Sequence, residues 1–296
     1  MTSSASAAKW IGECLLKSIL MEVCTWPKPG LVTPLSQGAH TDMDMWLFIT
    51  SSAAIAPCFY DCAQLGENYP NDSQTLLQKL RSVGIHYEKY LLQSTHQINT
   101  QRGILFAGSI LSAAAGQLSA NHQTLNYMSL SQSVKEICHN LCHNDFAILN
   151  HRPPQTHGEK LYIKYGIKGI RGEAEQGFPL VCNVGLSALH HALSAGLSWQ
   201  KSLVHTLLAL MAQCDDTTVL SRGGHTALNE MKQRAQQLIS SGGMLSPEID
   251  SALNDFNSWC LKKWVSPGGS ADLLALCLAM YFLCQPTDGD ITKEKI

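Results

Sequence analysis

The sequence has few charged residues, no excess of either sign and no long hydrophobic run. Of its 296 residues only 15% are charged, and the formal net charge is −2. Nucleic acid as the main partner would normally leave a basic stripe, which is absent. The longest apolar run, residues 273–284, is too short to cross a bilayer, and residues 1–10 lack the regions of a signal peptide. We therefore expect a cytoplasmic protein, and the 45% of hydrophobic residues indicates a large buried core.

Cysteine is frequent, but the spacing typical of a metal or disulfide framework is missing. The eleven cysteines are odd in number, scattered and never arranged as Cys-x-x-Cys. We expect reduced thiols that pack as small hydrophobic side chains. Cys138 and Cys142 are four positions apart, which places them on one helical face together with His139 and His143. A zinc site there is the minor alternative.

Alternating apolar and polar residues, the pattern of a half-buried strand, are almost absent. Apolar residues instead recur every three or four positions, as in Leu203, Leu207 and Leu210. The sequence also lacks an internal repeat and a long linker. We predict an all-α fold with one large multi-helix domain over residues 1–296, in which loops at the helix junctions form one cleft. The predicted helices cover residues 5–24, 42–64, 72–93, 103–118, 128–149, 178–195, 199–214, 224–241, 246–264 and 270–284, and residues 94–102 and 151–177 are predicted to be non-helical.

Motifs of several common chemistries are missing as well. There is no Gly-x-x-x-x-Gly-Lys-Ser/Thr phosphate loop, no Gly-x-Ser-x-Gly and no His-Glu-x-x-His, so ordinary kinase chemistry is not indicated. The chain does have a stiff loop at Pro27–Gly30, followed by His40, Thr41 and Asp42 where a helix resumes. A helix start beside carboxylates suits a phosphate together with its metal ion. The alternative is that Thr41 or Asp42 only caps the helix.

A similar composition recurs at other helix junctions. Arginine offers a planar fork that matches phosphate oxygens, and Arg102, Arg171 and Arg222 each precede a glycine. Acids near a phosphate need a cation between them, and Mg²⁺ takes one or two carboxylates plus phosphate oxygens. Asp215 and Asp216 are predicted to follow a helix C-terminus, where acids oppose the helix dipole and therefore indicate a function. The candidate magnesium ligands are Asp42, Asp44, Asp215, Asp216 and Asp272, although capping also explains Asp272.

Six motif blocks follow one another along the chain: PKPGLV (27–32), GAHTDMD (38–44), INTQRG (98–103), GIRGEAEQGFPLV (169–181), DDTTVLSRGG (215–224) and VSPGGSADLL (265–274). Together they resemble the triphosphoribosyl-dephospho-CoA synthase family. These all-helical enzymes make the prosthetic-group precursor of citrate lyase or malonate decarboxylase. Two positions depart from the family pattern. Gln101 stands where such proteins usually have histidine, and Asp215 replaces a glycine, so that the family's aspartate aligns with Asp216.

The resemblance implies a glycosyl transfer. The ribose 2′-hydroxyl of 3′-dephospho-CoA attacks the anomeric carbon of ATP, adenine leaves, and the triphosphate stays on the transferred ribose. An oxocarbenium-like transition state needs a nearby carboxylate and a base for the attacking hydroxyl. The implied catalytic residues are Glu173 and Glu175, in either assignment, and the implied Mg²⁺ ligands are Asp42, Asp216 and Asp272. The implied substrate-binding residues are Lys28, Gly30, His40, Asn99, Arg102, Arg171, Arg222, Gly223, Gly268, Gly269 and Ser270.

The family also implies partners. ATP and 3′-dephospho-CoA are the substrates, and a downstream transferase attaches the product to an acyl carrier protein subunit. Two other functions stay open. One is an all-α, Mg²⁺-dependent hydrolase of an ADP-ribosyl or nucleotide N-glycosyl bond, in which water replaces the attacking hydroxyl. The other is a non-catalytic nucleotide-binding partner, which would bind ATP without consuming it.

Overall fold

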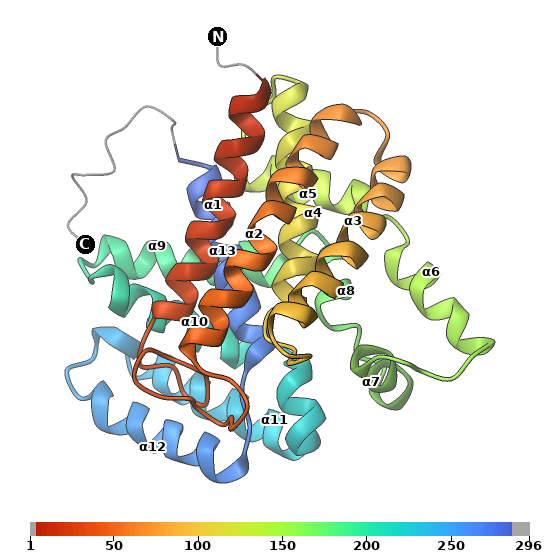
Figure 1. Ribbon diagram of the computed structural model, residues 1–296. Helices are drawn as coiled ribbons and strands as arrows, with labels where there is room; N and C mark the ends of the chain where they lie inside the picture. The colour runs from red at the N-terminus through yellow and green to blue at the C-terminus, as the bar shows by residue number, and fades with distance from the viewer. Residues whose placement is uncertain (1–3, 286–296) are drawn as a thin grey trace. The chain divides into compact units, whose positions relative to one another are not determined.

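The structure, a computed structural model, describes residues 4–285, and all regular secondary structure in that range is helical, with no β-strand (Figure 1). The one extended pairing within it is an isolated bridge between Thr33 and Ser36. The predicted all-α fold is therefore confirmed. The chain divides into two compact units, and each is described below by itself. Unit 1 contains the residues up to Leu20 together with Trp46–Pro179, and unit 2 contains Met21–Met45 together with the residues from Leu180 onward. The predictions of one domain and of one cleft stay predictions.

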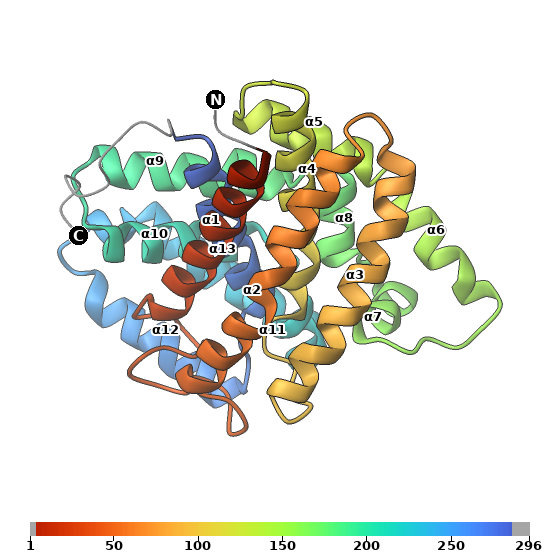
Figure 2. The same ribbon diagram turned by 45° about the horizontal axis from the view of Figure 1, so that its top comes forward.

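Unit 1 is a helical bundle built on α4 (Arg102–Ala120), in which every residue from Ala107 to Leu118 is buried. Helices α3 and α5 pack against α4 and against each other, as both views show (Figures 1 and 2). A helix that is apolar on all sides belongs in a core, because no face of it gains from contact with water. The other helices of this unit are most of α1 (Ser4–Cys24) and α2 (Met45–Asn68), then α3 (Ser73–Ser94), α5 (Tyr127–Ile137), α6 (Leu141–Ala147), the 3₁₀ turn η1 (Ile148–Asn150), α7 (His157–Tyr165) and α8 (Gly169–Glu175).

The same core position explains why α4 passes a simple test for a membrane span. Among the described residues it is the one helix long and apolar enough to cross a bilayer by length and composition. However, 78% of the tested window is buried inside the protein. Its apolar surface is thus already covered by neighbouring helices.

Helices α2 and α4 cross with their backbones in contact. A Cβ atom added to Gly66 would lie 2.1 Å from the carbonyl oxygen of Ala113, and one added to Gly116 would lie 2.1 Å from that of Ala63. Both distances are far shorter than any real carbon–oxygen contact, so only glycine fits at the two positions. The small residues of these helices therefore set how closely the core of unit 1 packs.

Unit 2 is organised around α10 (Trp199–Gln213), whose residues from Ser202 to Ala212 are all buried. Helices α9, α11 and α13 pack on α10, and the loop of residues 25–45 lies beside α12 (Figures 1 and 2). The remaining elements are the π-helical turn η2 (Val181–Gly185), α9 (Leu186–Ser194), α11 (Thr217–Ser240), the 3₁₀ turn η3 (Gly243–Leu245), α12 (Ile249–Lys263) and α13 (Gly268–Leu283).

Three parts of the predicted helix pattern are wrong. Helix α11, predicted to begin at residue 224, begins at Thr217. The helix predicted over residues 128–149 is interrupted at Asn140, which adopts left-handed angles (φ 57°) and separates α5 from α6. The stretch 151–177, predicted to be non-helical, contains α7 and α8. Thr156 starts α7 through a reciprocal capping box with Glu159, which supplies the missing partners of the first amides.

Candidate active site

A buried ion pair fixes the loop of the first motif block to the end of α1. Lys28 Nζ lies 2.5 Å from Glu22 Oε1, and the two side chains are only 2% and 8% exposed. The same ammonium group donates to the backbone carbonyl of Glu22 at 2.7 Å, near the C-terminal end of α1. Lys28 was predicted to bind substrate phosphate, but its charge is already paired and buried here. These contacts anchor the loop to the end of α1, and the predicted contact of Lys28 with phosphate stays untested.

Gly30 serves packing in the same loop. Its amide donates to Asn257 Oδ1 of α12 at 3.0 Å. Its φ of 74° is a left-handed value, and an added Cβ would lie 2.5 Å from the carbonyl oxygen of Val265. A side chain is therefore excluded by both conformation and space. Its predicted contact with substrate stays untested.

Arg222 and His40 together connect three of the six motif blocks. Its NH1 group donates to the carbonyl of Ala39 at 2.7 Å, and its NH2 group lies 3.2 Å from His40 Nδ1. On the other side of the ring, His40 Nε2 lies 2.9 Å from Ser266 Oγ. Burial, together with the charge of Arg222, lowers the pKa of His40 to about 4. The imidazole is therefore neutral at pH 7.

Asp216 is buried completely and caps two helices. Its Oδ1 accepts from the amides of Thr218 and Val219 at 3.0 and 3.2 Å, at the start of α11. Its Oδ2 accepts from the amide and the hydroxyl of Ser270 at 2.7 and 3.0 Å, at the start of α13. As predicted, Asp216 follows the C-terminus of α10, which ends at Gln213. The prediction missed that Asp216 also lies at the starts of α11 and α13, where a carboxylate is favoured.

This geometry decides how well Asp216 fits a metal ion. A carboxylate has about four lone-pair directions, and four hydrogen bonds occupy them here. As a magnesium ligand Asp216 therefore does not fit this structure. The bonds to Ser270 also engage an amide that was predicted to bind phosphate, whereas the predicted roles of Gly268 and Gly269 stay untested.

The other predicted metal ligands are not gathered into a preformed centre. Within residues 4–285, no group of three or more His, Cys, Asp or Glu side chains is placed to hold a metal ion. The side chain of Asp42 is 57% exposed and lies 3.7 Å from His40 Nδ1. Asp42 thus offers an accessible carboxylate, while Asp272 lies in the first turns of α13. Their metal roles stay predictions.

A break in α11 follows Arg222. Gly224 has φ 66° and ψ −171°, angles that are essentially restricted to glycine, and it divides α11 into two helical parts. An added Cβ at Gly224 would meet no atom within 4 Å, whereas one at Gly223 would lie 2.3 Å from Ala227 Cβ. The second part of α11 therefore begins directly after Gly224, close in sequence to Arg222.

In unit 1 the third motif block forms the start of α4. Arg102 pairs with Glu88, and its amide lies 3.4 Å from Asn99 Oδ1. Gln101, which replaces the family's histidine, is 3% exposed and bonds to the hydroxyls of Ser51 and Ser52 of α2. Gln101 therefore belongs to a buried polar network. Its neighbour Arg102 is half-exposed and remains a candidate for substrate.

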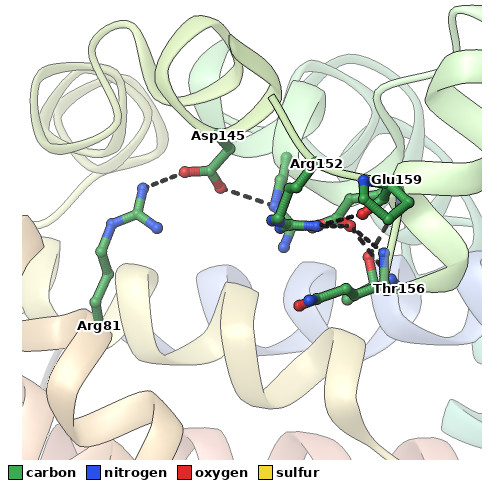
Figure 3. Close-up of polar contacts among 8 residues, drawn as sticks. Arg81, Asp145, Arg152, Thr156 and Glu159 are labelled. Atoms are coloured by element: carbon green, nitrogen blue, oxygen red, sulfur yellow. Dashed lines mark hydrogen bonds and ion pairs between the residues drawn. The ribbon is translucent and has the colours of Figure 1, made fainter. Parts of the chain in front are cut away.

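Arg171 of α8 shares a carboxylate with a second arginine. Its Nε donates to Asp145 Oδ2 at 2.9 Å, while Arg81 NH2 donates to Asp145 Oδ1 at 2.5 Å; Figure 3 shows Arg81 facing Asp145. The guanidinium of Arg171 also lies 5.7 Å from the centre of the Phe106 ring, which is in α4. The contact with Phe106 brings the fourth motif block to α4, the helix that begins in the third block.

The two predicted catalytic glutamates lie on α8. Positions two apart on a helix point to nearly opposite sides, so Glu173 and Glu175 do not face one point. Glu175 Oε1 accepts from the amide of Cys142 at 3.0 Å, and Oε2 pairs with Lys168 at 3.3 Å. Although burial raises it, these bonds leave the pKa of Glu175 lowered. Glu175 lines an open pocket of about 560 Å³ together with Lys135, His139, Asn140, Gln176 and Pro179.

Several residues that hold the motif blocks were missed in the sequence. Ser266 stands inside the last block, and its proximity in sequence to the glycines was a usable signal. Asn257 and Asp145 lie in the middle of helices whose pattern gives no hint of a polar partner. Only the fold places them beside Gly30 and Arg171.

Comparison with known proteins gives the same family that the motif blocks resemble. The family model described as ATP:dephospho-CoA triphosphoribosyl transferase matches residues 8–290. A probable 2-(5''-triphosphoribosyl)-3'-dephosphocoenzyme-A synthase of Malonomonas rubra is 36% identical over 95% of this chain and 90% of its own length. The 2-(5''-triphosphoribosyl)-3'-dephosphocoenzyme-A synthase of Pectobacterium atrosepticum is 39% identical over 92% of this chain and 88% of its own.

A solved structure gives a weaker match. The crystal structure of a protein from Archaeoglobus fulgidus, titled a putative triphosphoribosyl-dephospho-coA synthase, covers 80% of this chain and 97% of its own with a TM-score of 0.45 and 15% sequence identity. By its fold and motif loops this chain is an all-helical protein of the transferase class. It belongs to the ATP:dephospho-CoA triphosphoribosyl transferase family.

Proposed function

We propose that this protein transfers the triphosphoribosyl group of ATP to 3′-dephospho-CoA. The 2′-hydroxyl of dephospho-CoA forms a bond to the anomeric carbon of ATP and gives up its proton, while the bond from that carbon to adenine breaks. Adenine leaves, and the product is 2′-(5″-triphosphoribosyl)-3′-dephospho-CoA. The names of the relatives that are 36% and 39% identical support this reaction, because each match covers at least 88% of the relative's own length.

The observation that carries the proposal is the convergence at Arg222. The guanidinium is held by the carbonyl of Ala39 and by His40, and the charge of Asp42, in the same loop as His40, also acts on it. These two hydrogen bonds fix the position of its positive charge without neutralising it, so the charge can attract an anionic ligand. The start of the second part of α11, directly after Gly224, adds the partial positive charge of a helix N-terminus near it in sequence. A polyphosphate chain has the matching chemistry.

We propose Glu173 as the carboxylate nearer the reacting centre. Glu175 is held by Cys142 and Lys168 on the side of α8 that faces α6, as is Arg171 through Asp145. Glu173 lies on the other side of the same helix. A carboxylate there would stabilise the positive charge that develops on the ribose or accept the proton of the attacking hydroxyl. Asn99 and Arg102 at the start of α4 complete the proposed substrate contacts of this unit.

A magnesium ion is proposed to accompany ATP, because Mg²⁺ is usually held by one or two carboxylates and by substrate phosphates. Asp42 fits such a role best, since its carboxylate is exposed in the same loop as His40. The ion would neutralise phosphate charge. We further propose that the enzyme works in the cytoplasm and passes its product to a transferase that loads an acyl carrier subunit of citrate lyase or malonate decarboxylase.

The test is to incubate the purified protein with ATP, Mg²⁺ and 3′-dephospho-CoA, omitting each in turn. Free adenine and product mass are followed by chromatography and mass spectrometry. We expect adenine only when dephospho-CoA is present, with an adduct heavier by one triphosphoribosyl unit. Adenine without the adduct would instead indicate a hydrolase, and unchanged ATP would indicate a nucleotide-binding partner.

A second experiment tests the catalytic carboxylate. Glu173→Gln keeps the size of the side chain and removes its charge, so we expect the variant to fold and bind ATP while adenine release falls by about 100-fold or more. Glu175→Gln is the matched comparison on the same helix and should lose less. Near-normal turnover of Glu173→Gln would remove Glu173 from the mechanism.

A further inference from the structure

His40 and Arg222 make an arrangement whose hydrogen-bond directions are settled by chemistry. A guanidinium carries only donors, so at 3.2 Å from Arg222 NH2 the Nδ1 atom of His40 must be the acceptor. Nδ1 is then unprotonated, and the proton of the neutral ring lies on Nε2. That N–H points to Ser266 Oγ at 2.9 Å. Arg222 thus sets the tautomer, and Ser266, which is 1% exposed, accepts the remaining N–H and holds the ring in this orientation.

The three predicted phosphate-binding arginines differ in what holds them. Arg102 pairs with Glu88, and Arg171 pairs with Asp145, so a carboxylate neutralises each charge. Arg222 is held by two uncharged acceptors, the Ala39 carbonyl and the His40 ring. The charge of Asp42 also acts on Arg222, but the carboxylate of Asp42 is 57% exposed and makes neither of these two hydrogen bonds. The two hydrogen bonds fix the direction of the guanidinium and leave its charge able to attract an anion.

We infer that His40 and Ser266 are positioning residues that aim the guanidinium of Arg222 at a phosphate group of a substrate. The inference rests on the proposed function and deepens it, because it separates the residue that touches the ligand from the two that direct it. The bound chemistry is a phosphate chain, which either the triphosphate of ATP or the diphosphate of dephospho-CoA supplies. His40 acts through Arg222 and does not itself need to contact substrate.

Two substitutions at position 40 separate this role from a merely structural one. The side-chain oxygen of asparagine can occupy the place of Nδ1, whereas the amide of glutamine reaches the place of Nε2. His40→Asn should therefore keep the acceptor for Arg222, and His40→Gln should keep only the contact with Ser266. We expect His40→Gln to raise one substrate's KM about tenfold, the effect of losing roughly one hydrogen bond to a charged group, with kcat changed less than threefold. His40→Asn should change that KM less than threefold.

Arg222→Gln identifies the substrate and supplies the decisive comparison. It should raise the KM of the same substrate as His40→Gln, which distinguishes ATP from dephospho-CoA. The double variant should be no worse than Arg222→Gln alone, because a residue that acts through Arg222 has nothing left to position. Ser266→Ala should move the same KM in the same direction. His191→Asn, an exposed histidine of α9 in the same unit, is the control and should change neither KM.

Binding of inorganic triphosphate, measured by calorimetry on the full chain, gives a readout that does not need turnover. We expect wild-type binding to be lost in Arg222→Gln, weakened in His40→Gln and retained in His40→Asn. Additive effects in the double variant, or unchanged KM and unchanged triphosphate binding in His40→Gln, would overturn the inference. A wild-type protein that binds triphosphate in this pattern but forms no adduct would overturn the proposed function and leave the inference standing.

Discussion

Asp216 accepts two hydrogen bonds from Ser270, one from the backbone amide at 2.7 Å and one from the hydroxyl at 3.0 Å. Its other oxygen accepts from Thr218 and Val219, so one buried carboxylate ties the start of α11 to the start of α13. Asp216→Asn would place an amide donor against these donors. We expect the free energy of unfolding, measured by urea denaturation, to fall by about 3 kcal/mol.

The neighbouring acid is a matched control for this prediction. Asp215 is 60% exposed and pairs with Lys232 at 2.8 Å. Asp215→Asn should change the free energy of unfolding by less than about 1 kcal/mol, as is usual for exposed ion pairs. The Mg²⁺ concentration for half-maximal activity should be the same in Asp216→Asn as in wild type. A clear increase there would show that Asp216 does bind the metal.

Lys28 provides a test that separates loop anchoring from phosphate binding. Lys28→Met leaves the carboxylate of Glu22 buried without its partner, and we expect a loss of about 3–5 kcal/mol in the free energy of unfolding. The double variant Glu22→Leu/Lys28→Met removes both charges and should recover most of that loss. If Lys28 only anchors the loop, the double variant should also recover the wild-type KM for ATP. A stable double variant with a greatly raised KM would restore the phosphate-binding role.

Two glycines in open space should respond in opposite ways to the same substitution. Gly224→Ala forces a side chain into angles that only glycine adopts readily, and we expect a loss of about 1–3 kcal/mol. Gly84 lies within helix α3, where an added Cβ would also meet no atom within 4 Å. Gly84→Ala should therefore stabilise the protein by about 1 kcal/mol. Urea denaturation of both variants checks the signs, and a stabilised Gly224→Ala would contradict the break in α11.

The Arg152–Glu159 pair predicts a pH dependence of stability (Figure 3). Hydrogen bonds from Arg152, together with those from the amides of Gln155 and Thr156, lower the pKa of Glu159 from 4.5 to about 2. A carboxyl group with a lowered folded-state pKa stabilises the fold above its unfolded pKa. This contribution is fully present above about pH 5 and is lost as the pH falls through the range from 4.5 to 2.

Glu159→Gln lacks this titration, so it isolates the effect. The difference in free energy of unfolding between wild type and variant, from urea denaturation at a series of pH values, should be largest above pH 5 and should shrink towards pH 2. A difference that stays constant across that range would mean that the carboxylate charge of Glu159 does not stabilise the fold.

Most of the helices were predictable because their apolar residues repeat at the helical period. Helices α1, α3, α10 and α13 begin and end within two residues of the predicted bounds. The break at Asn140 was not predictable, because the apolar period continues through it while a single residue adopts left-handed angles. Short α8 was missed for a related reason, since its seven residues include two glycines and offer too few turns for a period to appear.

The candidate site was predictable in its residues more than in their roles. The motif blocks include Arg222, His40 and Asp216, which the fold brings into direct contact with Ala39, Ser266 and Ser270. Local sequence could not show which charges would be neutralised. Whether an arginine or lysine is available to a ligand depends on partners far away in the chain, such as Glu88 for Arg102 and Asp145 for Arg171.

The order of the chain through the two units has a consequence for synthesis on the ribosome. The loop of residues 27–44 emerges early, but His40 meets Arg222 and Ser266 only after a further 182 and 226 residues have been made. Unit 1 has all of its sequence once Pro179 has been translated, while this loop still lacks its partners in unit 2. The segment richest in motif residues is therefore among the first to leave the ribosome and among the last to acquire its structure.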